Sequence, residues 1–267
     1  MLSMPLITIK GNIMPRLIDS LLRYIASFGR LTLLGFLTLV TSTSFATETE
    51  QQVQAWIIAA DSYRMPFKSG ELKSALTLYK NEEKQQSSEF FIQVNEQGDS
   101  RVTMLNQRSK GQKVLLTESA MWLYVPRTHK AIRITPMQRL MGQASYGDVS
   151  SLSWQHEYQW DKNPVVTKTD SVCFSVTAIR KSATYRKINL CLQKDSLRPV
   201  NAQFYLASGK LMKQATYITD IDNPQRISTT KFTQPNKKTQ YTLMHNSDYQ
   251  AKKLSKHIFT RQGFIKR

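Results

Sequence analysis

The sequence has 267 residues, 40% of them hydrophobic, and its 37 Lys and Arg residues against 19 Asp and Glu residues give a formal net charge of +18. This length is enough for one large domain or two small ones with a substantial core. The excess of positive charge favours anionic partners, namely acidic proteins, lipid headgroups or nucleic acid. With only two Cys and four scattered His residues, the composition argues against a metal site.

Residues 1–46 have the pattern of a secretory signal peptide. Basic residues precede an apolar run of about ten residues, Leu31 to Val40, and small residues follow at Ser44 and Ala46. A run of this length is too short to span a bilayer, which takes ~20 residues. We therefore expect a cleaved leader and a mature domain over residues 47–267 in the periplasm.

The alternative for this leader is an uncleaved anchor over residues 17–40. Such an anchor would place Arg23 and Arg30 inside the membrane, which is costly. No Cys follows the apolar run, so the leader offers no lipid-attachment site. Export also argues against nucleic acid as the anionic partner.

Residues 48–63 carry the one long helical pattern of the mature chain. Apolar residues recur along one face of this segment, at Val53, Trp56, Ile57 and Ala60. Pro66 ends the pattern because proline cannot continue a helix. We expect this helix to anchor on a sheet through Trp56.

After Gly70 the hydrophobic period changes to two, which is typical of half-buried strands. Strand patterns follow every 8 to 12 residues as far as Asn246, about eleven in all, with turn signals between them. One such pattern is the alternating series Leu152, Trp154, His156, Tyr158 and Trp160. We therefore predict one mainly β domain of the α+β class, with an antiparallel sandwich or a barrel formed by a strongly curved sheet.

The segment from Lys113 to Ser153 reads as three strands followed by a Met-rich excursion. Trp122 and Tyr124 share one face of the second strand, because alternate residues of a strand point the same way. Pro136 ends the third strand. Beyond it, one helical face is predicted from the spacing of Met137, Leu140 and Met141.

The two cysteines, Cys173 and Cys191, lie in a predicted hairpin that turns at Ser182. Both are nine residues from this turn, so they face each other on adjacent strands, near disulfide reach. An oxidising compartment favours the bond. The alternative is a pair of buried free thiols.

Four segments of the chain resemble the periplasmic outer-membrane lipoprotein-sorting family, which is LolA/LolB-like. They are Trp122–Ile134 (WLYVPRTHKAIRI), Ser145–Leu152 (SYGDVSSL), Ser208–Gln234 and His257–Phe264 (HIFTRQGF). The order in which the segments occur, rather than any single motif, carries the resemblance. It covers most of the chain after residue 50.

The resemblance implies an unclosed barrel covered by an N-terminal helix and a short helical lid. It also implies a carrier that moves acyl chains of lipoproteins or other lipids between the inner and outer membranes, beside an inner-membrane transporter. We expect a monomer. The predicted acyl-chain cavity is lined by Trp122, Tyr124, Ile132, Met137, Leu140 and Met141. The alternative is that residues 136–144 plug the barrel end as ordinary core.

Catalytic motifs are missing from the sequence, which has no H-E-x-x-H, P-loop or G-x-S-x-G pattern. We therefore expect neither an enzyme nor a cofactor. Two other functions stay open. One is a periplasmic sensor or regulator that binds lipid or lipoprotein on the same scaffold and signals through a membrane protein. The other is an enzyme, built from distant residues, that acts on an envelope lipid or glycan.

Residues 251–267 include six Lys or Arg and no Asp or Glu. We predict that Lys252, Lys253 and Lys256 contact an anionic membrane surface, because basic residues near such a surface strengthen binding. The alternative is solvated charge that keeps the protein soluble.

Overall fold

The computed structural model describes residues 50–265, so the predicted signal peptide lies outside the described residues. A helix covers residues 50–64. The strands are β1 (Gly70–Lys80), β2 (Glu83–Val94), β3 (Ser100–Met104), β4 (Lys113–Leu116), β5 (Met121–Val125), β6 (Lys130–Ile134), β7 (Arg139–Met141), β8 (Ala144–Ser145), β9 (Tyr158–Trp160), β10 (Val166–Thr167), β11 (Ser171–Ala178), β12 (Lys187–Gln193), β13 (Pro199–Tyr205), β14 (Leu211–Thr219), β15 (Ile227–Thr233) and β16 (Gln240–Ala251). Short helices are α2 (Tyr146–Ser150), α3 (Trp154–Glu157) and α4 (Arg261–Ile265), and 3-10 turns are η1 (Gln107–Ser109), η2 (Pro126–Thr128) and η3 (Lys256–Phe259).

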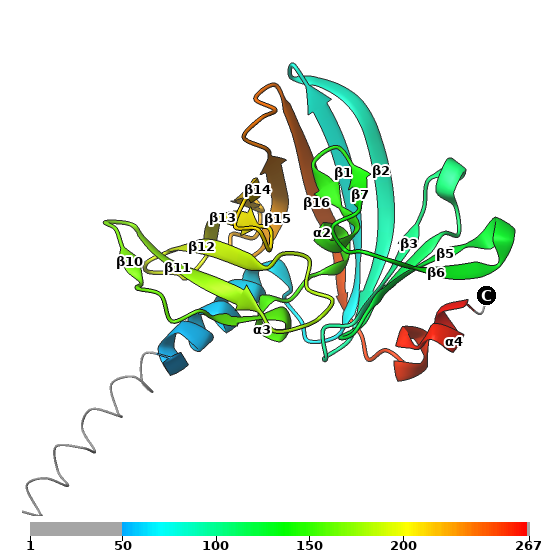
Figure 1. Cartoon of the computed structure of the whole chain (residues 1–267), viewed down its shortest axis with the longest axis horizontal. Helices are drawn as coiled ribbons and strands as arrows, with labels where there is room; N and C mark the ends of the chain where they lie inside the picture. Colours follow the sequence, from blue (N-terminus) through cyan, green and yellow to red (C-terminus); the bar gives the residue numbers. More distant parts are fainter. Residues whose placement is uncertain (1–49, 266–267) are drawn as a thin grey trace, which may run out of the picture. The chain divides into compact units, whose positions relative to one another are not determined.

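A 14-stranded antiparallel sheet runs from β10 at one end to β6 at the other, with β9 paired to β11 off this path. Figure 1 shows that the sheet curves strongly, and its two end strands do not pair with each other. The predicted curved, unclosed sheet is confirmed. Sixteen strands are assigned among residues 50–265, where about eleven were predicted. Strands of two or three residues, such as β8 and β10, are too short to show a period.

The inner face of the sheet forms one continuous apolar core. Alternate residues of nearly every strand point into it, as the period of two requires. The helix over residues 50–64 adds Val53, Ile57 and Ala60 to this core, and Trp56 packs on Phe174 of β11 with ring centroids 5.9 Å apart. The predicted anchoring role of Trp56 is confirmed.

A second, smaller apolar cluster lies on the outer face of β4 and β5. Here Phe259 and Phe264, from η3 and α4, pack against Leu115 and Tyr124. Gly263 fits only because it lacks a side chain, since a Cβ atom would approach the His257 carbonyl oxygen to 2.0 Å. The C-terminal segment is therefore folded against the sheet, not a freely solvated tail.

The β7–β8 hairpin and α2 lie inside the curve of the sheet (Figure 1). We call residues 139–150 the plug. The predicted helix through Met137, Leu140 and Met141 is wrong, because the chain turns back at Gly142, whose φ of +55° is incompatible with an α-helix. A helix begins only after Ser145, whose capping box with Asp148 starts α2.

The predicted aromatic strand over residues 152–160 is also wrong in its first half. Residues 154–157 form α3, and only Tyr158–Trp160 pairs as a strand. The carboxylate of Asp61 accepts hydrogen bonds from the backbone N–H groups of Trp154 and Gln155, each at 2.9 Å. This cap comes from a distant helix, so the local alternation could not reveal it.

Cys173 and Cys191 face each other on β11 and β12 and form a disulfide, as predicted. Both lie on the half-buried outer side of the sheet. We expect the variant C173A/C191A to lose about 3 kcal/mol of unfolding free energy, because the bond restricts the unfolded chain. Denaturant unfolding of wild type and variant measures the loss, and equal midpoints would show that the bond contributes nothing.

Candidate ligand-binding groove

The space enclosed by the sheet is largely filled. The plug lies inside the curve, and cavities of only about 30 Å³ and 20 Å³ lie beside it. Met141 is buried in the main core, and Leu140 packs against that core. Within residues 136–144, the second half packs as core and turn, whereas Met137, Gln138 and Arg139 are exposed.

The residues predicted to line one cavity are not brought together. Trp122 and Tyr124 point to the outer face, where they join the C-terminal cluster. Leu140 and Met141 pack on the inner face. Ile132 pairs with Leu123 at the end strand β6 and is 50% exposed, and Met137 is exposed beside the plug. The sequence could not distinguish inner from outer face here, because both faces of β5 carry large apolar side chains.

A buried ion pair holds the plug to the sheet. Lys213 of β14 lies against Asp148 of α2, and both side chains are almost fully buried. The Lys213 ammonium also donates to the Gln143 carbonyl at 2.8 Å, and the Tyr185 hydroxyl donates to Asp148 at 2.8 Å. Burial lowers the pKa of Lys213 and raises that of Tyr185 well above its ordinary value. A Lys at an inward position of an alternating strand was the sequence signal for this site.

A cavity of about 590 Å³ lies between the end of the first helix, the β2–β3 turn and α3. Its volume falls within the usual range of ~300–1,000 Å³ for ligand pockets. We call it the groove. Its apolar lining comes from the end of the first helix, the following link and β2, namely Ile58, Met65, Pro66, Phe67 and Val94. Polar lining comes from the β2–β3 turn and α3, namely Asn95, Glu96, Gln97, Ser153, Gln155 and His156.

Two buried side chains fix the walls of the groove. Asp61 accepts hydrogen bonds from the Ser153 hydroxyl at 3.0 Å and from Arg64 at 3.2 Å, besides capping α3. Asn95 closes the β2–β3 turn by accepting from the backbone N–H groups of Gln97 and Asp99, at 3.1 and 2.8 Å. These hydrogen bonds hold the walls in place within the folded chain.

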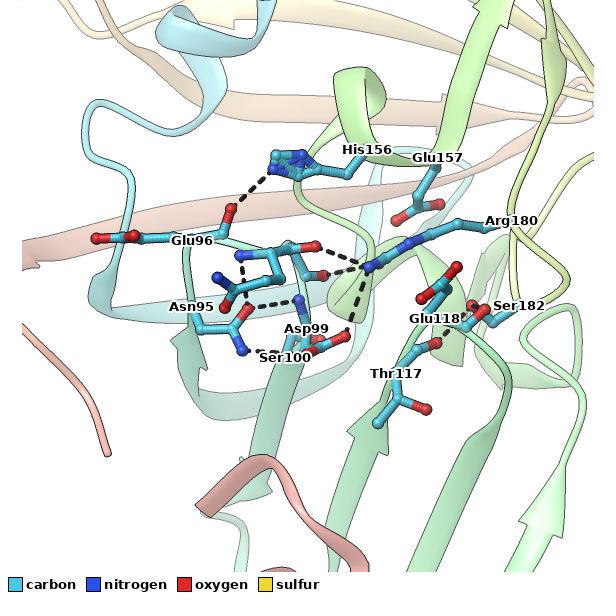
Figure 2. A network of polar contacts seen from close by, with 12 residues as sticks. Asn95, Glu96, Asp99, Ser100, Thr117, Glu118, His156, Glu157, Arg180 and Ser182 are labelled. Atoms are coloured by element: carbon cyan, nitrogen blue, oxygen red, sulfur yellow. Dashed lines mark hydrogen bonds and ion pairs between the residues drawn. The ribbon is translucent and has the colours of Figure 1, made fainter. Parts of the chain in front are cut away.

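Figure 2 shows how Arg180 ties the β11–β12 turn to the β2–β3 turn. Its guanidinium donates to the Gln97 carbonyl at 2.7 Å and lies 3.6 Å from the Asp99 carboxylate. The Ser182 hydroxyl is 2.6 Å and 2.9 Å from the carbonyl oxygens of Thr117 and Glu118. These contacts join the two ends of the curved sheet beside the groove.

His156 and Glu157 lie next to this junction (Figure 2). The imidazole Nε2 is 2.9 Å from the Glu96 carbonyl oxygen, so it acts as the donor. Burial, with the positive charge of Arg180, lowers the pKa of His156. The Glu157 carboxyl accepts from the Ser151 hydroxyl at 2.6 Å, while its other oxygen is buried with no hydrogen-bond partner among the described residues.

Burial raises the pKa of Glu157 to about 7, from an ordinary value of 4.5. The folded protein therefore holds this proton more tightly than the unfolded chain. The resulting stability is fully present below pH 4.5 and is lost as the pH rises through 7. When the pH is raised from 4.5 to 8, we expect the free energy of unfolding of Glu157→Gln to increase by about 3 kcal/mol relative to that of the wild type.

Urea unfolding at both pH values measures this effect. Glu96→Gln, which changes an exposed carboxylate of the same region, is the control and should show no such gain. The same difference between wild type and Glu157→Gln at both pH values would contradict the raised pKa.

Sequence reasoning missed the groove because its walls come from three separate segments. In the sequence, residues 97–99 (QGD) predict only a hairpin turn. Among residues 50–265, no group of three or more His, Cys, Asp or Glu side chains is placed to hold a metal ion. None of the helices in that range has the length and apolar character needed to cross a bilayer.

Of the predicted membrane-contact lysines, Lys252 and Lys253 lie before η3 and Lys256 is its first residue. Lys252 pairs with Glu71 at 3.1 Å, whereas Lys253 and Lys256 are exposed. Lys252 is therefore partly neutralised by a carboxylate of β1. The exposed pair carries the free positive charge of this part of the chain.

A protein-family model described as an uncharacterized protein matches residues 98–266. Among solved structures, the chain is similar to a LolA superfamily protein from Nitrosomonas europaea, with a TM-score of 0.69 and 24% identity over 79% of this chain and 98% of that one. It is also similar to an outer membrane lipoprotein-sorting protein domain from Vibrio parahaemolyticus, with a TM-score of 0.60 and 19% identity over 79% and 97%. The comparison with curated proteins gave no match.

Proposed function

We propose that this chain is a member of the LolA/LolB-like family, because its fold is similar to that of a LolA superfamily protein and of an outer membrane lipoprotein-sorting domain. In this proposal it carries acyl chains of lipoproteins or other lipids through the periplasm, between the inner and outer membranes. In this proposal residues 1–46 are a cleaved signal peptide and residues 47–267 the mature carrier. An inner-membrane transporter delivers the cargo. The function is binding, with no chemical step.

The groove is the observation that carries this proposal. Its volume of about 590 Å³ is enough for a lipid chain, and it has an apolar lining bounded by polar groups. Such a lining suits an acyl chain, because burying each methylene stabilises the complex by about 0.8 kcal/mol. The polar rim suits the headgroup or the peptide to which the chain is attached.

The first helix offers a precise test of the groove. Ile58 lines it and is 47% exposed, so a substitution there spares the core. We expect Ile58→Glu to weaken binding of a dansylated fatty acid about tenfold or more, since a carboxylate must lose water to sit against the chain.

The matched control is Ile218→Glu, because Ile218 is 46% exposed on β14 and does not line the groove. It should bind the probe as wild type does. Equal binding by all three proteins, or no binding by wild type, would refute the groove as the acyl-chain site. Melting curves of the three proteins show whether each is folded.

Membrane contact is part of the same proposal. Lys253 and Lys256 are exposed, and each basic residue near an anionic surface adds up to about 1 kcal/mol of binding. We expect K253Q/K256Q to weaken binding to anionic liposomes at low salt and to match wild type at high salt. If the variant binds as tightly as wild type at low salt, these lysines act only as solvated charge.

A further inference from the structure

Strand β6, at one end of the large sheet, pairs only with β5. The five residue pairs between these strands run in register without a bulge. The opposite side of β6 therefore presents unused backbone N–H and C=O groups in a regular row. Ile132 in the middle of this strand is half exposed, so the free edge presents a large apolar side chain.

A cavity of about 530 Å³ lies beside the C-terminal end of β6. Met121 and Ile134 give it an apolar wall, and Arg133 and Lys181 supply positive charge from opposite sides. No carboxylate lines it among the described residues. Neither these two cations nor Lys130 forms an ion pair with a residue in the described part of the chain.

We propose that β6 is a docking edge for an extended, acidic segment of a partner protein. The segment adds a strand to the sheet through main-chain hydrogen bonds. Its apolar side chains cover Ile132 and enter the adjacent cavity, and its carboxylates meet Arg133, on the opposite face of β6, and Lys181. This surface is separate from the groove proposed for acyl chains, so either proposal can fail alone.

Charge decides which strand fits this edge. Pairing β6 with the β6 of a second copy would bring four cations onto two adjacent strands, with no carboxylate to offset them. Lysine on an edge strand commonly discourages such self-association. The same charges favour an acidic segment. The exposed Ile132 favours a segment in which acidic and apolar residues alternate.

Peptide binding to the full mature chain tests this proposal. The probe is a fluorescein-labelled octapeptide of alternating Glu and Val. Two control peptides are used. One alternates Lys and Val, and the other has the probe's sequence but is N-methylated on alternate residues. We expect the unmethylated acidic peptide to bind at least tenfold more tightly than either. Hydrogen exchange should show new protection at the amides of residues 130–134.

The variant Arg133→Glu should weaken binding of the acidic peptide at least tenfold. Arg186→Glu is its matched control, because both arginines are exposed and each makes one hydrogen bond of 3.4 Å to a carbonyl. Three results would overturn the proposal: equal binding of the methylated peptide, equal binding by the Arg133 variant, or no acidic-peptide binding at millimolar concentration. If phosphatidylglycerol vesicles alone require Arg133, the site binds lipid headgroups and the proposal is likewise overturned.

Discussion

Replacing Lys213 with Met is expected to lower the free energy of unfolding by about 3–5 kcal/mol. The variant leaves the Asp148 carboxylate in the core, still hydrogen-bonded to Ser145 and Tyr185 but without its cation. Removing one partner of a buried pair costs more than the pair itself contributes, because the remaining charge is uncompensated. Denaturant unfolding of both proteins measures the loss.

The double variant K213M/D148N serves as the control for this prediction. It also removes the unpaired negative charge of Asp148, so it should recover part of the unfolding free energy lost in Lys213→Met. A loss below about 1 kcal/mol in the single variant would mean that water reaches Asp148. The plug would then be less tightly held than the buried ion pair implies.

Phe264→Ala is expected to cost about 3–5 kcal/mol, the usual range for a buried aromatic residue. Phe264 is fully buried on the outer face of the sheet, edge-on to Tyr124 with ring centroids 6.1 Å apart. The same change removes part of the cover of Leu115, which lies in the same cluster. Thermal and denaturant melts measure the effect.

Phe264→Leu keeps most of the apolar volume and should cost much less than the alanine variant. An alanine variant that melts like wild type would show that the C-terminal segment detaches without weakening the sheet. In that case the C-terminal segment would behave as a solvated tail.

Alternation along the chain was enough to predict the sheet and the disulfide. A period of two places Cys173 opposite Cys191 once the hairpin turn is known, and the register confirms it. The same alternation could not say which side of β5 is the inner one. Trp122 and Tyr124 are as apolar as Met121 and Leu123, and only the distant C-terminal segment decides which pair faces outward.

The plug and the groove depend on contacts between distant segments. Gly142 packs so closely on Thr242 that a Cβ atom would lie 2.3 Å from its hydroxyl oxygen, and this contact favours a turn over the helix that the Met spacing indicated. Asp61 caps α3 from the first helix, which converts half of a predicted strand into a helix. Neither effect appears in a local pattern, because the partner lies about 90 or more residues away.

Lipid extraction and mass spectrometry of protein purified from the periplasm test the central claim most directly. If the chain carries acyl chains in the groove, the wild-type protein and Ile218→Glu should each contain about one lipid per chain, and Ile58→Glu should contain much less. A wild-type protein free of lipid, or an Ile58→Glu protein with the same lipid content as wild type, would contradict the account.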